Sequence, residues 1–488
     1  MSEHSQNLIT SLTEKFNTPV TKYLENYKYH STSSQQNVKD IQIGFDITAI
    51  PPEGKTIIMA GPYVVLNDLY WNPVTDATAI SILVNGVTID FQGYSLICQN
   101  QIYKTTGIES FGGNNITVIN GIIKQVSYVG IYFSLCADIQ IQDFTVQGLS
   151  WEDLSIRDVT PSGIFLQGCY NSTIINCHVK DVKVKTDSSA GFLLTECDLA
   201  TINNCRVSNF INLDGAVQGF AYILSINIET TNSHSFKLRS FFKNNILTTG
   251  HTVLGFVCIA STFLTYFKCS SRSIIGSCDD VHGISLFLIS NVKVNEFFVK
   301  NVVDGVTSTK TGAKATGIEV YGSDVTVSNC KVVDILAIRP QDKQCTGFSA
   351  ARGSNIKFRN CIAKNVNVLN AQIQKDIRFG RGTGFGWAPD PRAAFAMPAY
   401  NVTYKNCTAI NCQVGFDSWY HINSLWKNVT TRNCIICILK NVRKKRTLYC
   451  NQCSECNPPK TTTLKNVAKG NRFENIYCLN IRSPCCKI

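Results

Sequence analysis

A unit of alternating apolar and polar residues recurs along most of the chain. Representative copies are NITVINGIIKQV (115–126), DIQIQDFTVQGL (138–149), NSTIINCHVKDV (171–182), DVTVSNCKVVDI (324–335) and NIKFRNCIAKNV (355–366). Each copy begins with a period-two alternation, passes through a polar residue and then resumes the alternation. This pattern predicts short β-strands with one face inward, and the polar residue predicts a tight turn between two of them.

The register of this unit is nearly constant, because a glycine at the start of the preceding strand lies thirteen positions before the polar turn residue. The pairs are Gly107 and Asn120, Gly130 and Asp143, Gly163 and Asn176, Gly191 and Asn204, Gly219 and Asn232, Gly255 and Lys268, Gly283 and Glu296, Gly347 and Asn360, and Gly415 and Asn428. Asn tolerates the left-handed conformation that a tight turn needs, and stacked Asn amides can hydrogen-bond to one another.

Cysteine follows the turn residue in several units, at an inward position where it acts as a small apolar filler. These residues are Cys177, Cys205, Cys269, Cys330, Cys361 and Cys407. Each unit has room for three short strands and no helix, so the units are expected to stack as coils with parallel pairing. The sequence therefore predicts an all-β fold: a right-handed single-stranded parallel β-helix of about 12 coils with capping ends.

Two stretches carry a resemblance to a known family. GPYVVLNDLYW (61–71), followed by AISILVNGVTIDFQGYSL (79–96), resembles the opening coils of right-handed β-helix proteins of the pectate-lyase type. The later Gly … Asn-Cys units resemble the parallel β-helix repeats of these proteins. The Asn-rich and Cys-rich style also resembles uncharacterised β-helix proteins of amoeba-infecting large DNA viruses. The resemblance implies a polysaccharide or other glycan as partner, with reactive groups on the strands and long loops of one side.

The opening coil contains a lone carboxylate, Asp90, between two β-forming runs. Alignment of inward residues places Val87 on Ile116 and Asp90 on Ile119. Later coils put unrelated residues at the position of Asp90, so we expect a solvated turn residue there.

The chain divides into three parts. Residues 1–44 are polar, with an apolar helical pattern near Ile9 to Tyr27 that Pro19 interrupts, and they are predicted to cap the solenoid. Residues 45–440 form the β-helix, and residues 441–488 form a basic and Cys-rich tail. The net charge of +12 allows contact with anionic glycans, nucleic acid or membrane surfaces. The basic run KNVRKKR (440–446) is better explained as a solvated cap, so a nucleic-acid partner is not expected.

The start of the chain lacks the pattern of a signal peptide, and its longest apolar stretch, 255–267, is too short to span a bilayer. We therefore expect synthesis in the cytosol, no membrane span, and a location in a virion or in host cytoplasm. Reduced thiols are then favoured over disulfides for the 22 cysteines.

The connections between successive units vary most, and they occupy one place in the repeat, so they should line one edge of the solenoid. The best candidate for chemistry there is CDDVHGIS (278–285), which resembles, in compressed form, the Asp-Asp and Gly-His-Gly elements of polygalacturonase-type glycosidases. Asp279, Asp280 and His282 are the candidate catalytic residues, together with Asp304 from the next unit. Paired carboxylates about 5–10 Å apart could act as acid and base in glycoside hydrolysis. The alternative is a set of solvated turn carboxylates and a loop histidine.

A polysaccharide lyase would instead use an Arg or Lys base and Ca²⁺ held by carboxylates at the loop edge. Arg378, Arg381 and Arg392 are candidate substrate-binding residues for this chemistry, and Trp387 is a candidate sugar-stacking platform. They lie in or beside the aromatic insertion 379–398. The alternative is an ordered loop that covers the side of the solenoid.

The tail cysteines Cys450, Cys453, Cys456 and Cys478 could supply four thiolates to a structural Zn²⁺. Disulfides or free thiols are the alternatives.

The sequence thus favours a protein that binds or cleaves a polysaccharide along the loop edge, as a lyase or a glycoside hydrolase if it is an enzyme. The alternative is a non-catalytic structural or attachment protein, such as a virion component, that could form a homotrimer.

Overall fold

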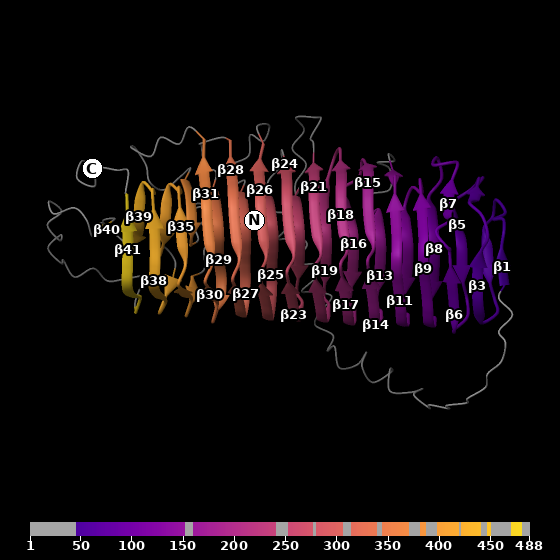
Figure 1. Ribbon diagram of the computed structural model, residues 1–488, viewed down its shortest axis with the longest axis horizontal. Helices are drawn as coiled ribbons and strands as arrows, with labels where there is room; N and C mark the ends of the chain where they lie inside the picture. The colour runs from indigo at the N-terminus through magenta and orange to yellow at the C-terminus, as the bar shows by residue number, and fades with distance from the viewer. Residues whose placement is uncertain are drawn as a thin grey trace, which may run out of the picture.

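The computed structural model describes residues 45–151, 160–240, 252–276, 280–305, 314–338, 344–369, 381–386, 398–418, 421–440, 447–449 and 470–480. In these ranges all the regular secondary structure consists of β-strands. The strands stack as a right-handed parallel β-helix, with the N-terminal coils (indigo) at one end and the C-terminal coils (yellow) at the other (Figure 1). The fold predicted from the sequence is confirmed.

The first sheet is formed by the strand that follows the variable connection in each coil. Its members are β2 (Lys55–Ile57), β5 (Ala77–Ile82), β8 (Thr105–Phe111), β10 (Val129–Ser134), β13 (Ser162–Gln167), β16 (Ser188–Thr195), β19 (Ala216–Ile223), β22 (Thr252–Ile259), the first parts of β25 (Asp280–Asn295), β27 (Lys314–Ser328) and β29 (Gln344–Ser354), β32 (Arg381–Phe385), β36 (Val414–Asp417) and β39 (Ile436–Lys440).

The second sheet comes next in each coil. Its members are β1 (Phe45–Ile47), β3 (Gly61–Val65), β6 (Val87–Asp90), the first parts of β9 (Asn114–Lys124) and β11 (Ala137–Gln147), β14 (Tyr170–Ile175), β17 (Asp198–Asn203), β20 (Ile226–Thr231), β23 (Thr262–Phe267), the later parts of β25, β27 and β29, β30 (Lys357–Arg359), β33 (Ala399–Tyr400), β34 (Thr403–Lys405), β37 (His421–Ile422) and the first parts of β38 (Leu425–Arg432) and β41 (Arg472–Leu479).

The third sheet completes the coil. Its members are β4 (Leu69–Trp71), β7 (Ser95–Cys98), the later parts of β9 and β11, β12 (Ser150–Trp151), β15 (His178–Val184), β18 (Arg206–Asn212), β21 (His234–Ser240), β24 (Ser270–Gly276), β26 (Phe298–Asp304), β28 (Lys331–Ala337), β31 (Ile362–Val368), β35 (Thr408–Ile410) and the later parts of β38 and β41. The stack contains slightly more coils than the sequence predicted.

Pairing between described coils is parallel, and β40 (Thr447–Tyr449), antiparallel to β39, is the exception among the described strands. The register predicted for the opening coil is confirmed, because Val87 pairs with Ile116 and Asp90 with Ile119. The predicted C-terminal end of the β-helix, residue 440, comes too early in the sequence. β41 lies in the segment assigned to the tail, and it pairs in parallel with β38 as a further strand of the solenoid.

The predicted turn residues all adopt the left-handed conformation, from Asn120 (φ 56°) to Asn428 (φ 52°), including the less tolerant Lys268 and Glu296. Their amides form the expected column. Asn204 Nδ2 donates to Asn176 Oδ1 at 2.8 Å, and similar bonds join Asn329, Asn360, Asn406 and Asn428 in later coils. Such bonds support the bend between the second and third sheets in many coils, although Asn232 and Asn329 donate instead to Asn203 and Asn295, one position before the turn residue.

Asp90 takes part in the same column. Its carboxylate accepts a hydrogen bond from the Asn120 side chain at 3.1 Å and another from the Gln92 backbone at 2.8 Å. It is half-buried and begins the amide column, so the expectation of a turn residue is confirmed.

Further left-handed columns lie five residues on either side of the predicted one, as at Asn115 and Asn171 before it and at Asp181 and Asn209 after it. They too are joined by side chains, for example by the bond of 3.0 Å from Asn209 Nδ2 to Asp181 Oδ1. The sequence reasoning recognised one such column, whereas each coil bends at several.

The repeated glycine marks a close approach between coils. At Gly255, a Cβ atom would lie 2.2 Å from Ser271 Oγ and 2.5 Å from the carbonyl oxygen of Gly283, the equivalent residue one coil on. Neither contact is sterically tolerable, so a side chain is excluded there. The constant glycine therefore follows from the width of the solenoid.

The lumen is filled by stacked inward side chains. Phe192, Phe220 and Phe256 stack face to face with ring centroids 4.8 and 4.5 Å apart. The cysteines after the turn are buried, as expected, and they also donate to backbone. Cys177 Sγ lies 3.3 Å from the carbonyl oxygen of Ile175 and 3.5 Å from that of Ile141 in the preceding coil. Serine can take this place because its hydroxyl makes the same bonds.

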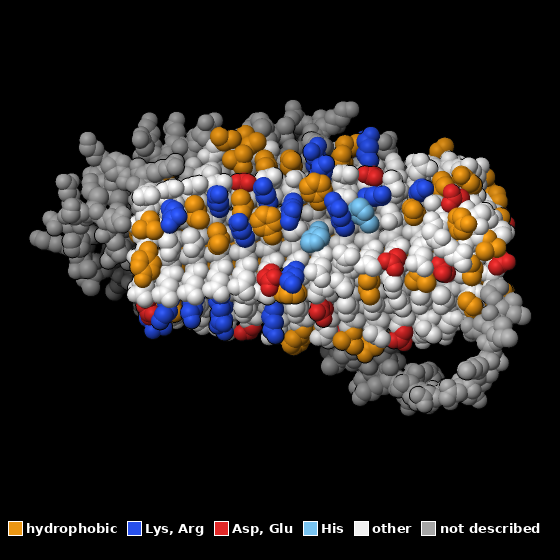
Figure 2. Space-filling view, viewed as in Figure 1, with side chains coloured by type: hydrophobic (Ala, Val, Ile, Leu, Met, Phe, Trp, Pro, Cys, Tyr) orange, Lys and Arg blue, Asp and Glu red, His pale blue; other side chains and the backbone are white. Residues whose placement is uncertain are grey.

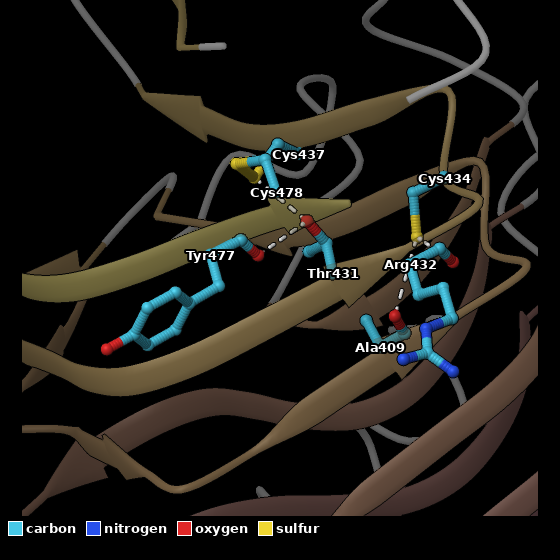
Figure 3. The surroundings of a disulfide bond; sticks show 7 residues. All are labelled: Ala409, Thr431, Arg432, Cys434, Cys437, Tyr477 and Cys478. Atoms are coloured by element: carbon cyan, nitrogen blue, oxygen red, sulfur yellow. Dashed lines mark hydrogen bonds between the residues drawn. A yellow bond between two sulfur atoms is a disulfide. The ribbon is translucent and has the colours of Figure 1, made fainter. Parts of the chain in front are cut away.

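One pair of cysteines is oxidised. Cys437 of β39 and Cys478 of β41 form a disulfide that joins the first-sheet and third-sheet strands of the last described coil (Figure 3). Thr431 Oγ1 lies beside the bridge, 2.9 Å from Cys437 Sγ. The preference for reduced thiols is therefore wrong for this pair, and the described cysteines outside the disulfide are all buried.

The amide column yields a first prediction. Asn360 is left-handed (φ 52°) and has one column bond on each side, to Asn329 and from Asn406. Asn360→Ala should lower the free energy of unfolding by about 2 kcal/mol, because alanine disfavours this backbone and removes both bonds. Asn360→Gly should cost less, since glycine removes the bonds but accepts the conformation. Equal urea midpoints for the two variants would contradict this account.

The disulfide yields a second prediction. Cys478→Ser opens a covalent loop with a sequence separation of 41 residues and should lower the free energy of unfolding by about 3 kcal/mol. Cys434→Ser, which changes a buried cysteine outside this disulfide, is the control. Thermal unfolding of both variants with and without a reductant measures the effect. If the melting temperature of the wild type is the same with and without the reductant, the disulfide does not stabilise the fold.

Candidate functional site

The predicted catalytic cluster begins at the connection before β25. Asp280 is the first residue of that strand and is half-buried, and His282 follows it at an outer position of the first sheet, paired with Leu254 and Thr316. Asp304 ends β26 in the third sheet. Asp279 lies outside the described residues.

His282 does not face an open groove. Its side chain is 3% exposed, and its Nδ1 atom lies 3.2 Å from Oε2 of Glu319, which is 8% exposed and belongs to the next coil. The two residues form a buried pair on the outer side of the first sheet. Glu319 was missed in the sequence because its partner lies more than thirty residues away.

Asp304 is wholly buried, with 0% of its surface exposed. It lies near Cys345, whose thiol pKa is raised, mainly by burial and in part by the negative charge of Asp304. Asp304 was a candidate catalytic residue at the loop edge, and its burial excludes it from contact with a polymer there. The last residue of a third-sheet strand turns inward here, so the carboxylate is part of the interior.

The remaining candidates can be placed only in part. Arg381 opens β32, but its side chain is not among those described. Arg378, Trp387, Arg392, Cys450, Cys453 and Cys456 all lie outside the described residues. Cys478 is in the disulfide, so it is not available as the fourth zinc ligand that the sequence suggested. Within the described ranges, no group of three or more His, Cys, Asp or Glu side chains is placed to hold a metal ion.

A second titratable cluster lies inside the C-terminal coils. Tyr404 Oη is 3.1 Å from His421 Nε2, and both residues are 0% exposed, as is Asp417 nearby. Burial raises the pKa of Tyr404, and Asp417 adds to the effect. A cluster closed to solvent on all sides cannot meet a polymer, so we assign it to core packing.

The outer side of the third sheet carries a feature that the sequence reasoning missed. We call the outward side chains of β15, β18, β21, β24, β26, β28 and β31 the basic face. Its cations are Lys180, Lys183, Arg206, Arg239, Arg272, Lys300, Lys331 and Lys364. Figure 2 shows them as a band of blue side chains along the solenoid, with few red ones among them.

Carboxylates are almost absent from the basic face. In these seven strands Asp304 points inward, and Asp181 and Asp334 lie at the left-handed bends. The two bend carboxylates accept hydrogen bonds from Asn209 at 3.0 Å and from Asn365 at 2.7 Å. The positive charge of the face is thus not neutralised by ion pairs within its strands.

Aromatic rings lie between the cations. The Arg272 guanidinium lies over the Phe298 ring at 4.9 Å, and Phe236 is flanked by Arg206 at 5.7 Å and Lys237 at 5.1 Å. Such contacts hold a cation flat against the sheet without removing its charge.

Two histidines on this face have lowered pKa values. Burial, with the positive charges of Arg206 and Lys180, lowers the pKa of His178 to about 4. Burial, with Arg272 and Arg206, also lowers the pKa of His234. Both imidazoles are therefore neutral at pH 7, and each hydrogen-bonds to a serine, Ser208 or Ser270.

The signal for the basic face is present in the sequence but requires the coil register. Arg272 and Lys300 lie 28 residues apart in the sequence and become neighbours only when the units are aligned by their turn residues. The outward positions carry no repeated residue type, so local periodicity does not reveal them.

Comparisons with known proteins address the fold. Residues 64–221 match the family model described as right handed beta helix region. No curated protein matches the chain. No helix in the described ranges has the length and hydropathy needed to cross a bilayer.

Solved structures similar to this chain include an alginate lyase in complex with a trisaccharide (10% identity, TM-score 0.36, 91% of this chain and 81% of that one). Another is the tailspike protein of E. coli bacteriophage HK620 in complex with a pentasaccharide (10% identity, TM-score 0.34, 90% and 70%). A third is the A-module of a mannuronan C-5 epimerase from Azotobacter vinelandii (10%, 0.30, 88% and 88%). Likenesses this distant carry no argument about activity.

The coil geometry, the register and the family match agree over the N-terminal half of the solenoid, and the same register continues to β41. The chain is therefore a right-handed parallel β-helix protein.

Proposed function

We propose that this chain binds a linear acidic polysaccharide along the basic face and holds the polymer without cleaving it. The observation that carries the proposal is the basic face: cations at outward positions of successive coils, with no carboxylate at those positions in the seven strands. Such a face attracts polyanions through several simultaneous contacts.

The geometry favours an extended polymer. Coils repeat about every 4.8 Å. The cations lie in three interrupted rows parallel to the solenoid axis, with at least one cation in each of the seven coils. A linear polysaccharide with a carboxylate or sulfate on its sugars can follow such a row. The phosphates of a nucleic-acid duplex wind around its axis. A duplex would therefore contact cations placed along the solenoid axis only at the points where its backbone crosses them.

Binding is favoured over cleavage by the positions of the titratable groups. Glycoside hydrolysis needs two carboxyl groups on either side of the bond, and lyase chemistry needs a base beside a neutralised acid. On the basic face the strands offer no outward carboxylate, and the candidates His282 and Asp304 are buried elsewhere.

The proposal predicts selective binding. We expect polyuronates and sulfated polysaccharides to bind, and neutral glucans not to bind, in calorimetric titrations with the full chain. Because the contacts are ionic, the affinity should fall steeply as salt rises from 50 to 200 mM, as is usual for such contacts. Equal affinity for neutral and acidic polymers, or a clear preference for duplex DNA, would refute the proposal.

Turnover is tested separately. After incubation with the bound polymer, with and without Ca²⁺, we expect neither new reducing ends nor unsaturated uronates. Either product would show an enzyme and would overturn the non-catalytic part of the proposal.

Charge removal at the basic face should weaken binding. Arg206→Gln, Arg272→Gln and Lys300→Gln together should raise the dissociation constant by roughly 100-fold, at about 1 kcal/mol for each cation near an anionic surface. The matched control removes three charges from the second sheet by Lys293→Gln, Lys357→Gln and Lys405→Gln, and should leave binding nearly unchanged. Similar losses in both triple variants would show that net charge, and not this face, controls binding.

The depressed pKa of His178 predicts a pH dependence of stability. The unfolded histidine titrates near its ordinary value of 6.5 and the folded one at about 4, so the unfolded state binds more protons between these values. The contribution is fully present above pH 6.5 and is lost as the pH falls toward 4. His178→Gln should show a smaller loss of melting temperature between pH 7 and pH 4 than the wild type, and identical profiles would contradict the assignment.

A further inference from the structure

The basic face contains two arginine–phenylalanine pairs that are built alike. The Arg206 guanidinium lies 5.7 Å from the centre of the Phe236 ring, and the Arg272 guanidinium lies 4.9 Å from the centre of the Phe298 ring. In both pairs the ring belongs to the coil that follows the arginine, in β21 for the first and in β26 for the second. The same contact therefore occurs twice along the face.

A serine accompanies each arginine, two residues away in the same strand: Ser208 in β18 and Ser270 in β24. Each serine is in register with the ring of the following coil, as Ser270 is with Phe298. Arginine, serine and phenylalanine therefore form a unit that spans two coils. We call Arg206, Ser208 and Phe236 the first unit, and Arg272, Ser270 and Phe298 the second unit.

The second unit is not a simple copy of the first in sequence. Arg206 precedes its serine along the strand, whereas Arg272 follows its serine. The ring lies in the row of the serine in both units, so the second unit repeats the first with two rows exchanged. The contact is thus preserved while the order of the residues is not, and the periodicity that builds the coils does not account for it.

The serines support these units from below. Ser208 and Ser270 are only 5% and 4% exposed. Their hydroxyl oxygens lie 2.7 Å from His178 Nε2 and 2.9 Å from His234 Nδ1. The arginine and the ring of each unit are therefore the groups that an external ligand can reach.

Exposed cations alternate with rings along the solenoid axis. In β18, β21, β24, β26 and β28, which are successive coils, these residues are Arg206, Phe236, Arg272, Phe298 and Lys331. The three cations are exposed and the two rings are half-buried. The ring coils also carry Arg239 and Lys300, which are half-buried, and Lys237, which is exposed at a left-handed bend. At about 4.8 Å per coil, like groups recur about every 9.6 Å.

This alternation matches a polysaccharide in which every second sugar carries an acid, because a sugar in an extended chain is about as long as one coil step. Stacking on a ring occupies the flat side of a guanidinium and leaves its N–H edge free to bind a carboxylate. The electron-rich face of a phenylalanine ring attracts the C–H groups of an uncharged sugar. A polymer with an acid on every sugar would instead bring carboxylates against the rings, where they would lose water without gaining a partner.

We propose that the basic face selects polysaccharides in which a uronate alternates with an uncharged sugar. The uronates bind at Arg206, Arg272 and Lys331, and the uncharged sugars lie against Phe236 and Phe298. This inference rests on the proposed function, because it names the class of acidic polysaccharide that the basic face binds. The cations supply the attraction to any polyanion, and the two rings determine the specificity.

Titration calorimetry with the full chain tests the selectivity. The probes are oligosaccharides of equal length from hyaluronan, in which a uronate alternates with an uncharged sugar, and from polygalacturonate, in which every sugar is a uronate. We expect the hyaluronan fragment to bind more tightly, although it carries half the charge. Equal or tighter binding of the polygalacturonate fragment would overturn this inference and leave the proposed function standing. If neither fragment binds, the proposed function and this inference are both wrong.

A pair of double variants tests the role of the rings. Phe236→Leu with Phe298→Leu should raise the dissociation constant for the hyaluronan fragment by roughly tenfold, because leucine keeps the apolar volume but has no ring face. Binding of inorganic polyphosphate, which has no sugar, should stay nearly unchanged and also shows that the variant is folded.

The matched control changes two outward rings of β23 in the second sheet, by Phe263→Leu with Phe267→Leu. One of these rings also has a cation over it, with Lys268 Nζ at 4.9 Å from the centre of Phe267. The control should bind both probes as the wild type does. An unchanged affinity of the Phe236 and Phe298 variant for the hyaluronan fragment, an equal loss of polyphosphate binding, or the same loss in the control would each overturn the inference.

Discussion

The structure depends on the parallel backbone ladder between coils, which can continue only if each coil bends at the same places. A strand cannot change direction sharply in the right-handed part of backbone space, so the bends require left-handed residues. Asn supplies this conformation at low cost, and its amide bonds to the Asn above and below, as between Asn176 and Asn204. Bend and stacking contact are thus provided by one residue type.

This arrangement separates the residues that hold the fold from those that can carry function. Inward positions are restricted to apolar side chains, with cysteine or serine beside the bends and glycine where coils approach most closely. Outward positions have no such restriction, and residues that are distant in sequence become neighbours one coil apart. Neighbouring cations such as Arg272 and Lys300 can therefore arise without any effect on the ladder.

The outward faces of the three sheets differ in exposure and charge. The second sheet is largely polar and exposed, the third is basic with rings among the cations, and the outward side chains of the first are mostly buried or half-buried. Burial is the main reason that the pKa of His178 is lowered, and the positive charges of Arg206 and Lys180 add to the effect. An anion on the third face would meet these cations, whereas Glu319 lies beside His282 in a closed place.

The sequence by itself determined the coil, its register and its bends, because these depend on local periodicity and on the preference of Asn for one backbone conformation. It predicted the pairing of Asp90 with Ile119 and the left-handed state of residues as unfavourable as Lys268. Only the tertiary structure decided which side chains meet solvent. Asp304 was a candidate for the loop edge and is buried, and Cys478 was a candidate zinc ligand, with a disulfide as an alternative, and forms a disulfide. Exposure and pairing depend on which coil lies beside a residue, and those contacts join positions that no local pattern relates.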